Sequence, residues 1–411
     1  MYRTYARTAA ILGTAALALT GCSTAGADSS GTAEIDIIVP IYSDATQPFW
    51  EGLVDDFESE HDDIKVNLQT IAFADLTQEV NTRVSTQQTP DLLVYSDFAA
   101  LAADDLLLPA EDVLPAELLS DMQPNLVSAG EYDGQKYGIP FLASVRALFY
   151  NKALFSAAGL TEPPATWDEL IAAGQKLVAS GVPGYGLAYG TTELDADLSA
   201  YMWNNGGEWK DGDAWTIDAP ENVEALSFLS SLVNEYGITQ PGGASATRND
   251  VWQLFGQGGV GMVQGANFLP TLLQAAGSTV DIGIAPMPTS GDADPVSLAV
   301  EDYMLAFRST QHPEAVRTFL SFVYADESYS DLMTAEGMLP VTQSAQEIIA
   351  ERNPAQAPFI DLLQTAKFYP TDDPTWPTIR SEVRTTLGAA IAGTTSAEDE
   401  LASLQSLAEN R

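Results

Sequence analysis

The alternation of short apolar runs with helix-period segments constrains the fold more than any other feature of the sequence. Residues 35–41 (IDIIVPI), 64–70 and 91–97 (DLLVYSD) have the length and composition of buried strands. Between them, residues 49–57 and 76–84 carry apolar side chains at helical spacing. This order predicts an α/β protein whose first three strands pair in parallel, because crossover connections of this kind join parallel strands.

The same alternation continues through the rest of the chain. Thr166 and Glu169 form a capping-box pattern, which predicts a helix from Asp168 to Val178. Further strands are expected at 184–190, 260–264, 281–285 and 303–307, and further helices at 198–204, 222–236, 397–408 and from Pro313 onward. With 45% hydrophobic and 18% charged residues, 411 residues suffice for two lobes, each with a core.

The N-terminus has the layout of a secretory signal peptide. Arg3 and Arg7 precede an apolar run at 9–19, which is too short to span a bilayer stably. The run closes with Leu-Thr-Gly-Cys22, which resembles a lipobox and predicts lipidation of Cys22; the alternative is an ordinary signal peptide with a chance cysteine. We expect residues 1–21 to be removed and residues 22–32 to be a flexible tether. The protein would then be extracytoplasmic, anchored to the cell membrane by a lipid on Cys22.

The charge excludes one class of partner. The chain has 57 acidic and 17 basic residues; loss of Arg3 and Arg7 leaves 15 basic residues and a formal charge of −42. A chain this acidic, without a Lys/Arg cluster, is repelled by phosphate backbones, so we expect no nucleic-acid binding.

Few residues with catalytic or metal-binding chemistry are present. Cys22 is the only cysteine, and the only histidines, His61 and His312, lie in polar, turn-like sequence. The glycine-rich segment 256–261 follows a helix and enters a strand, which reverses the order of a nucleotide loop. We therefore expect no enzyme, no cofactor and no metal site. A glycoside hydrolase stays open as a remote alternative, because it needs only two facing carboxylates.

The middle of the chain carries a family resemblance. Residues 131–170, which include EYDGQKYGIPF, LFYNKALFSAAGL and PPATWDEL, resemble the central signature of extracellular solute-binding protein family 1, the maltose-binding-like components of ABC importers. Supporting segments include TPDLLVYSD from Thr89, WNNGGEW from Trp203 and LFGQGGVGMVQGANF from Leu254. The resemblance covers about residues 35–405.

This resemblance implies the two-lobe periplasmic-binding-protein fold (type II), with a hinge and a ligand cleft between the lobes. It assigns residues 33–143 and 268–323 to the first lobe, and residues 144–267 and 324–411 to the second. The implied function is capture of a carbohydrate, a mono- or oligosaccharide, for delivery to the membrane subunits of an ABC permease. We expect a monomer.

Two arguments place the ligand site. Open α/β sheets bind ligands beyond the carboxyl ends of their strands, and the resemblance puts the same loops at the cleft. Sugars also need aromatic faces for stacking, and carboxylates, amides or arginines for their hydroxyls. The residues predicted to contact the ligand are Asp44, Gln47, Asp97, Ser144, Arg146, Trp203, Asn204, Asn267, Phe268, Glu301, Asp302, Tyr303, Trp376 and Arg380.

Some of these residues have simpler interpretations or depart from the family pattern. Core packing is the alternative for Trp203, and it fits Trp376 less well because the segment DDPTWPTIR is polar and proline-flanked. A solvated loop before the strand is the alternative for Glu301 and Asp302. By the resemblance, Ser144 occupies the position at which the maltose-binding member of the family has a carboxylate in the ligand cleft. Asn267 and Phe268 stand where many relatives have a stacking Gly-Pro-Trp.

These departures leave other functions open. The protein could bind a polyol, glycerol phosphate or another small polar solute, or serve as a surface scaffold lipoprotein. Glycerol phosphate would use Arg146 and Arg380, although the negative field of the chain opposes an anion.

Overall fold

The structure is a computed structural model that describes residues 32–190, 193–291 and 293–410. Cys22 and the expected signal peptide lie outside the described residues. The strands are β1 (Ala33–Ile41), β2 (Ile64–Ala72), β3 (Leu92–Tyr95), β4 (Glu131–Tyr132), β5 (Gln135–Lys136), β6 (Ile139–Asn151), β7 (Tyr185–Gly186), β8 (Lys210–Asp211), β9 (Ala214–Trp215), β10 (Met262–Ala266), β11 (Ile282–Ala285), β12 (Leu298–Ala306) and β13 (Lys367–Phe368).

Helices connect and cover these strands, and none in the described part of the chain is both long and apolar enough to cross a membrane. The helices are α1 (Thr46–Glu60), α2 (Leu76–Thr86), α3 (Ala99–Ala103), α4 (Ala110–Val113), α5 (Ala116–Asp121), α6 (Pro124–Ala129), α7 (Lys152–Ala157), α8 (Trp167–Ala179), α9 (Leu194–Trp203), α10 (Pro220–Asn234), α11 (Arg248–Gly256), α12 (Leu269–Ala275), α13 (Pro313–Val323), α14 (Asp326–Glu336), α15 (Gln343–Arg352), α16 (Ala357–Gln364), α17 (Trp376–Ile391) and α18 (Ala397–Glu409).

The first three strands pair as the sequence predicts. β1 lies between β2 and β3 and is parallel to both, with Ile37 opposite Leu68 on one side and Leu92 on the other. α1 buries Trp50 and Phe57 among the apolar side chains of this sheet. The β-α-β-α-β interpretation of residues 35–97 is therefore confirmed.

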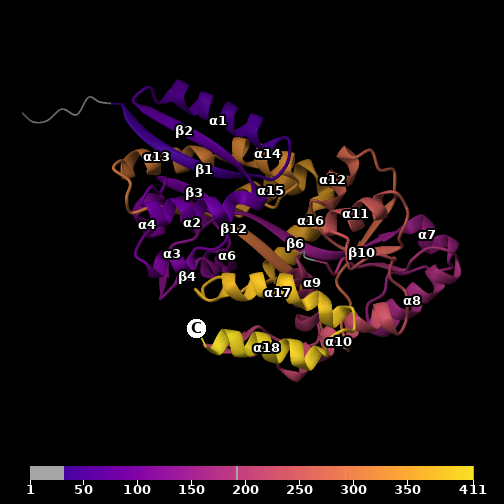
Figure 1. Cartoon of the computed structure of the whole chain (residues 1–411). Helices are drawn as coiled ribbons and strands as arrows, with labels where there is room; N and C mark the ends of the chain where they lie inside the picture. Colours follow the sequence, from indigo (N-terminus) through magenta and orange to yellow (C-terminus); the bar gives the residue numbers. More distant parts are fainter. Residues whose placement is uncertain (1–31, 191–192, 292, 411) are drawn as a thin grey trace, which may run out of the picture.

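β6 joins the two halves of the molecule (Figure 1). The strand order is β2-β1-β3-β12-β6-β10-β7. β12 is antiparallel to β3 and to the first part of β6, whereas β10 pairs with β6 from Arg146 to Tyr150. Ser144 and Arg146 therefore lie where β6 passes from one half to the other, and both side chains are buried.

β12 begins earlier than the strand expected at 303–307, which corrects the interpretation of Glu301 and Asp302. These residues pair with Ala143 and Leu142 inside the strand instead of forming a turn or a solvated loop before it. They are only 4% and 8% exposed. A bulge between Asp302 and Tyr303 shifts the register, and such bulges re-aim side chains at functional sites.

Helices α8, α9, α10, α17 and α18 build the core of the other half, below β6 in Figure 1. Thr166 caps α8 as predicted and accepts a hydrogen bond from the Glu169 amide at 3.3 Å. Only Tyr185–Gly186 of the segment expected as a strand at 184–190 forms one. α9 starts at Leu194, four residues before the expected helix, and so includes two aspartates, Asp195 and Asp197.

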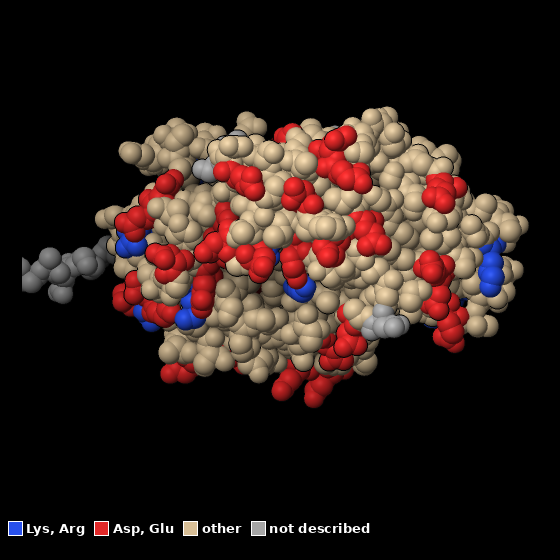
Figure 2. All heavy atoms as spheres, turned by 90° about the horizontal axis from the view of Figure 1, so that it is seen from below, with Lys and Arg blue, Asp and Glu red and all other residues tan. Residues whose placement is uncertain are grey.

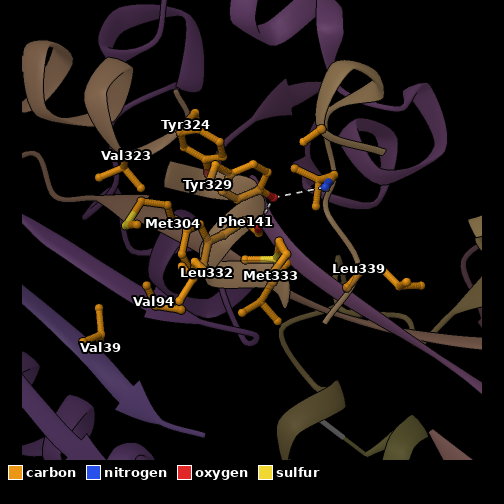
Figure 3. Close-up of a cluster of buried hydrophobic side chains, with 14 of the residues drawn as sticks. Val39, Val94, Phe141, Met304, Val323, Tyr324, Tyr329, Leu332, Met333 and Leu339 are labelled. Atoms are coloured by element: carbon orange, nitrogen blue, oxygen red, sulfur yellow. Dashed lines mark hydrogen bonds between the residues drawn. The ribbon is translucent and has the colours of Figure 1, made fainter. Parts of the chain in front are cut away.

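A cluster of buried side chains packs α13 and α14 against the first sheet (Figure 3). The Tyr329 hydroxyl donates a hydrogen bond to the Phe141 carbonyl and accepts one from the Val341 amide at 3.0 Å.

Strand β11 pairs with the end of β6 that also pairs with β10. Each of these contacts joins residues that are expected in different lobes: Tyr329 with Phe141, and β11 with the second part of β6. The division into lobes stays a prediction.

Candidate functional site

Carboxylates and arginines from distant parts of the chain gather where the two halves meet. They come from the end of β3, from β6 and β12, from α9 and the residue before it, and from α11 and α17. We call them the charged network, and its members are Asp97, Arg146, Glu193, Asp195, Asp197, Arg248, Asp302, Arg380 and Arg384.

The side of the network next to the first sheet holds two aspartates. Asp97 follows β3, and its Oδ2 is paired with the guanidinium of Arg380 on α17. Asp302 accepts a hydrogen bond at 2.5 Å from the hydroxyl of Tyr42, which directly follows β1. Both aspartates are buried, and the remaining oxygen of Asp97 has no hydrogen-bond partner. The carboxyl ends of β1 and β3 therefore do contribute polar groups to one place, as the strand-end rule predicts.

The side formed by α9 and α17 holds a second set of ion pairs. Asp195 accepts two hydrogen bonds from Arg384, at 2.7 and 3.0 Å, in the bidentate arrangement that guanidinium and carboxylate favour. Asp197 accepts one from Arg248 at 2.9 Å. Glu193 lies less tightly among three arginines, 3.3 Å from Arg248, 3.9 Å from Arg384 and 4.0 Å from Arg146.

Arg146 is the least well paired cation of the network. Its Nη1 donates to the Ser144 hydroxyl at 3.2 Å, and its nearest carboxylate is that of Glu193. Arg146 is only 4% exposed, and its buried Nε has no hydrogen-bond acceptor. Burial lowers the pKa of Arg146 from its ordinary value.

Burial and ion pairing move the carboxyl pKa values in opposite directions. Burial raises the pKa of Asp302 and that of Asp197 to about 6. Burial also acts to raise the pKa of Asp195 and Glu193, but their arginine partners hold both below the ordinary range. Arg384, for example, pairs bidentately with Asp195 and favours its charged form.

Several predicted residues have structural partners instead of a place in the network. Asn204 is bound through both ends of its amide to the backbone of Val296, with two distances of 2.8 Å. Gln47 lies on the exposed side of α1, where it donates to Glu51 at 2.8 Å, and Asp44 is also exposed. Asn267 accepts from the Val145 amide at 3.0 Å and donates to the Gly337 carbonyl at 2.7 Å.

The predicted aromatic contacts lie in packed regions. Trp376 is fully buried, with Tyr369 stacked at 5.1 Å and Trp209 edge-on at 5.1 Å between ring centroids. Tyr303 packs edge-on against Phe98. Trp376 therefore belongs to the core in this structure, as the core-packing alternative predicts, and its role as a ligand contact stays a prediction.

Two further predicted residues also pack against neighbouring side chains, and Phe268 is only partly buried. Trp203 is buried at the end of α9, and its indole nitrogen has no hydrogen-bond partner. Phe268 packs edge-on against Trp252 at 5.8 Å. Of the fourteen predicted residues, the structure brings Asp97, Ser144, Arg146, Asp302 and Arg380 together.

Sequence reasoning missed Tyr42, Glu193, Asp195, Asp197, Arg248 and Arg384. One signal was present in the sequence of α9, LDADLSAYMW, where two aspartates interrupt an otherwise apolar helix. Charges buried in such a helix need partners, so the pattern requires cations from elsewhere. A second signal was the spacing of Arg380 and Arg384, which places both on one face of α17. No group of His, Cys, Asp and Glu among the described residues could hold a metal ion.

Comparison with known proteins is consistent with this architecture. Residues 43–329 match the family described as bacterial extracellular solute-binding protein. A binding protein of Brucella abortus (strain 2308) is 31% identical over 351 residues, which cover 84% of this chain and 85% of that protein. The sn-glycerol-3-phosphate-binding periplasmic protein UgpB of Rhizobium meliloti (strain 1021) is 25% identical over 306 residues, 68% of this chain and 70% of that protein.

Among solved structures, the cyclic alpha-maltosyl-1,6-maltose binding protein from Arthrobacter globiformis aligns with a TM-score of 0.78. It is 23% identical, and the alignment covers 92% of this chain and 99% of that one. The α/β class and the two-lobe maltose-binding-like fold predicted from the sequence are confirmed. By its sequence match and its fold, the chain belongs to the bacterial extracellular solute-binding protein family.

Proposed function

We propose that this protein captures a carbohydrate at the charged network and delivers it to an ABC permease. Membership of the family makes the chain a solute-binding protein of the kind that serves ABC transporters outside the cytoplasm. The observation that carries the proposal is the network itself, because it gathers hydrogen-bond donors and acceptors where the two halves meet.

The chemistry of the network suits a polyhydroxylated ligand. Each sugar hydroxyl can donate one hydrogen bond and accept others, so it is best held between a carboxylate and an arginine. The network contains five carboxylates and four arginines, so its charges nearly balance. One oxygen of Asp97 and the Nε of Arg146 are buried without a hydrogen-bond partner, and a ligand hydroxyl that entered between the lobes would supply one.

Capture would follow from closure of the two lobes around the ligand. The proposed lobes comprise residues 33–143 with 268–323, and residues 144–267 with 324–411. Asp97 lies in the first and Arg380 in the second, so their ion pair forms only when the lobes are close. A ligand that contacts both lobes stabilises the closed form by its differential affinity for that form. We propose that the protein acts as a monomer.

A thermal-shift screen of the mature protein tests the proposal. Sugars, polyols, glycerol phosphates and amino acids are added singly, and binding raises the melting temperature because ligand stabilises only the native state. A ligand at one hundred times its Kd adds about 2.7 kcal/mol to the free energy of unfolding. We expect a mono- or oligosaccharide to give the largest shift and to be recovered unchanged. Silence across the panel would favour the scaffold alternative, and hydrolysis of the bound sugar would favour a glycoside hydrolase.

Glycerol phosphate is the second candidate function. It is favoured by the convergence of arginines in the network and by the similarity to the Rhizobium meliloti glycerol-3-phosphate-binding protein. The same panel separates the two functions, because a shift with glycerol phosphates and with no sugar would select the second.

We also propose that a lipid on Cys22 anchors the protein to the cell membrane. The support is the lipobox-like sequence Leu-Thr-Gly-Cys and the absence of any other cysteine in the chain. Cys22→Ser should release the protein from the membrane fraction into the medium or the soluble fraction. Retention of the variant in the membrane fraction would contradict the lipid anchor.

A further inference from the structure

Three arginines of the charged network converge on one carboxylate. Glu193, directly before α9, lies within 3.3 to 4.0 Å of the guanidinium groups of Arg146, Arg248 and Arg384. The three arginines come from β6, α11 and α17 respectively, which are far apart in the sequence. Only the fold brings them together, and three carboxylates of the charged network balance their charge.

The charge balance of this region depends on Glu193. Asp195 neutralises Arg384 at 2.7 Å, and Asp197 neutralises Arg248 at 2.9 Å. Without Glu193, three arginines would face two carboxylates and leave one positive charge uncompensated. Glu193 is therefore the counter-ion of the third arginine, at longer distances than either aspartate.

Glu193 is the most exposed carboxylate of this region. Its side chain is 38% exposed, compared with 32% for Arg384, 10% for Arg248 and 5% for Arg146. Asp195 and Asp197, by contrast, are buried within α9. A carboxylate held loosely and from the solvent side can be replaced without unfolding the helices that carry the arginines.

Two buried donors in this region make no hydrogen bond. The Nε of Arg146 has no hydrogen-bond partner, and the Nε of Arg248 lies 3.3 Å from a carboxylate oxygen of Glu193 but makes no hydrogen bond. An unsatisfied buried donor costs free energy, more so for a charged group. An incoming anion could satisfy donors that Glu193 leaves unfilled.

We propose that Arg146, Arg248 and Arg384 form an anion subsite, which Glu193 occupies in this structure, and that the natural ligand is a carbohydrate bearing one carboxylate or phosphate group. The inference rests on the proposed function and narrows its substrate class. On binding, the ligand anion takes the place of the Glu193 carboxylate among the three guanidinium groups, and the ligand hydroxyls reach Asp97 and Asp302.

The acidic surface of the protein does not prevent an anionic ligand from binding at this subsite. Figure 2 shows acidic side chains spread over the face seen from below, with few basic ones. At about 0.1 M salt, however, charges farther away than about 10 Å are largely screened, whereas a buried guanidinium in contact is screened much less. The subsite therefore dominates the energy of a bound anion, and the surface charge mainly slows its arrival.

Isothermal titration of the mature protein with matched pairs of ligands tests the inference. The pairs are glucose against glucuronate and glucose 6-phosphate, galactose against galacturonate, and glycerol against glycerol 3-phosphate. We expect at least one anionic sugar to bind about tenfold or more tighter than its neutral partner, the effect of one charge-assisted hydrogen bond. Raising the salt concentration should reduce this preference.

Variants at two positions, each with a matched control, test which residues cause the preference for the anion. Arg146→Met should abolish the preference for the anion, and Arg146→Lys should keep part of it. The control Arg308→Met removes an exposed arginine outside the network and should leave the preference unchanged. Glu193→Gln should bind the anionic sugar several-fold tighter, whereas Glu327→Gln, at an exposed ion pair, should not. If Arg146→Met does not fold, the affinity of Glu193→Gln for the anionic sugar still decides the test.

The outcomes separate the inference from the proposed function. Neutral sugars that bind as tightly as their acids would overturn the anion subsite and leave carbohydrate capture standing. A preference that persists in folded Arg146→Met, or weaker anion binding in Glu193→Gln, would also overturn it. Binding of glycerol 3-phosphate alone would support the subsite but refute carbohydrate capture, and no binding by any compound would overturn both.

Discussion

The carboxylate of Asp97 and the guanidinium of Arg380 form a buried ion pair, although 283 positions separate them in the chain. Asp97 lies just after β3, and Arg380 lies in the first turns of α17. The pair therefore ties the carboxyl end of the parallel strands to a helix of the opposite half. Buried pairs of this kind are strongly context dependent, and removal of one partner leaves the other charge buried and unpaired.

Arg380→Met should therefore destabilise the protein more than loss of an ordinary arginine does. We expect the free energy of unfolding in urea to fall by about 3 kcal/mol, because Asp97 keeps its burial and loses its counter-ion. The double variant Asp97→Asn with Arg380→Met should lose less than the two single variants together, with a coupling of about 1–3 kcal/mol. Arg352→Met, at an exposed pair, is the control and should have a far smaller effect. Strictly additive losses would show that the pair is not coupled.

The burial of Asp302, which accepts a hydrogen bond from Tyr42, predicts that the stability of the protein depends on pH. Burial raises the pKa of Asp302 to about 6, whereas an unfolded aspartate titrates near about 3.9. Between these values the native state binds more protons than the unfolded state. The contribution of Asp302 to stability is therefore fully present below about pH 4 and is lost as the pH rises through about 6.

Asp302→Asn isolates this contribution, because asparagine keeps an acceptor for the Tyr42 hydroxyl and does not titrate. On going from about pH 4 to about pH 7, the wild-type protein should lose about 2–3 kcal/mol of unfolding free energy relative to the variant. Urea denaturation at a series of pH values measures the difference. Asp213→Asn, at an exposed position, provides the matched control. A difference between wild type and Asp302→Asn that stays constant with pH would refute the expected linkage.

Local patterns were sufficient to predict much of the fold. The apolar run of β1, the spacing of α1 and the capping of α8 by Thr166 are each set by neighbouring residues, and the structure has all three. The resemblance then supplied the two-lobe fold, which local patterns alone do not give.

The charged network could be predicted only in part, because ion pairs join residues without any fixed spacing. With 57 acidic residues in the chain, nothing local indicates which carboxylate faces Arg384 or Arg248. The sequence places Asp302 directly before the strand expected at 303–307, but pairing with β6 extends β12 by five residues toward Leu298.

The need of a sugar for aromatic stacking faces predicts Trp376 at the site, and its polar, proline-flanked segment argues against core packing. The structure instead inserts its indole among Trp209, Trp215 and Tyr369. Trp376→Ala should lower the free energy of unfolding by about 3–5 kcal/mol, the usual cost of a large aromatic deleted from a core. The folded variant should keep ligand affinity within about tenfold of wild type. A larger loss of affinity with little loss of stability would instead make Trp376 a ligand contact.

Asn267 holds three segments together through one amide. It accepts from the amide of Val145 on β6 and donates to the carbonyl of Gly337, which ends α14 with a φ of 68°. Asn267→Ala leaves both backbone groups buried without this partner, and we expect a loss of about 2–4 kcal/mol in urea denaturation.

Asn267→Asp separates the two bonds. A carboxylate still accepts from Val145 but places negative charge against the Gly337 carbonyl, so the variant should be less stable than Asn267→Ala at neutral pH. In acid, the protonated carboxyl can donate again, and part of the stability should return as the pH falls. Asn410→Ala, at an exposed helix end, should change little and serves as the control. If Asn267→Ala were as stable as this control, the amide would not be the link between β6 and α14, and the apolar packing around it would have to carry that role alone.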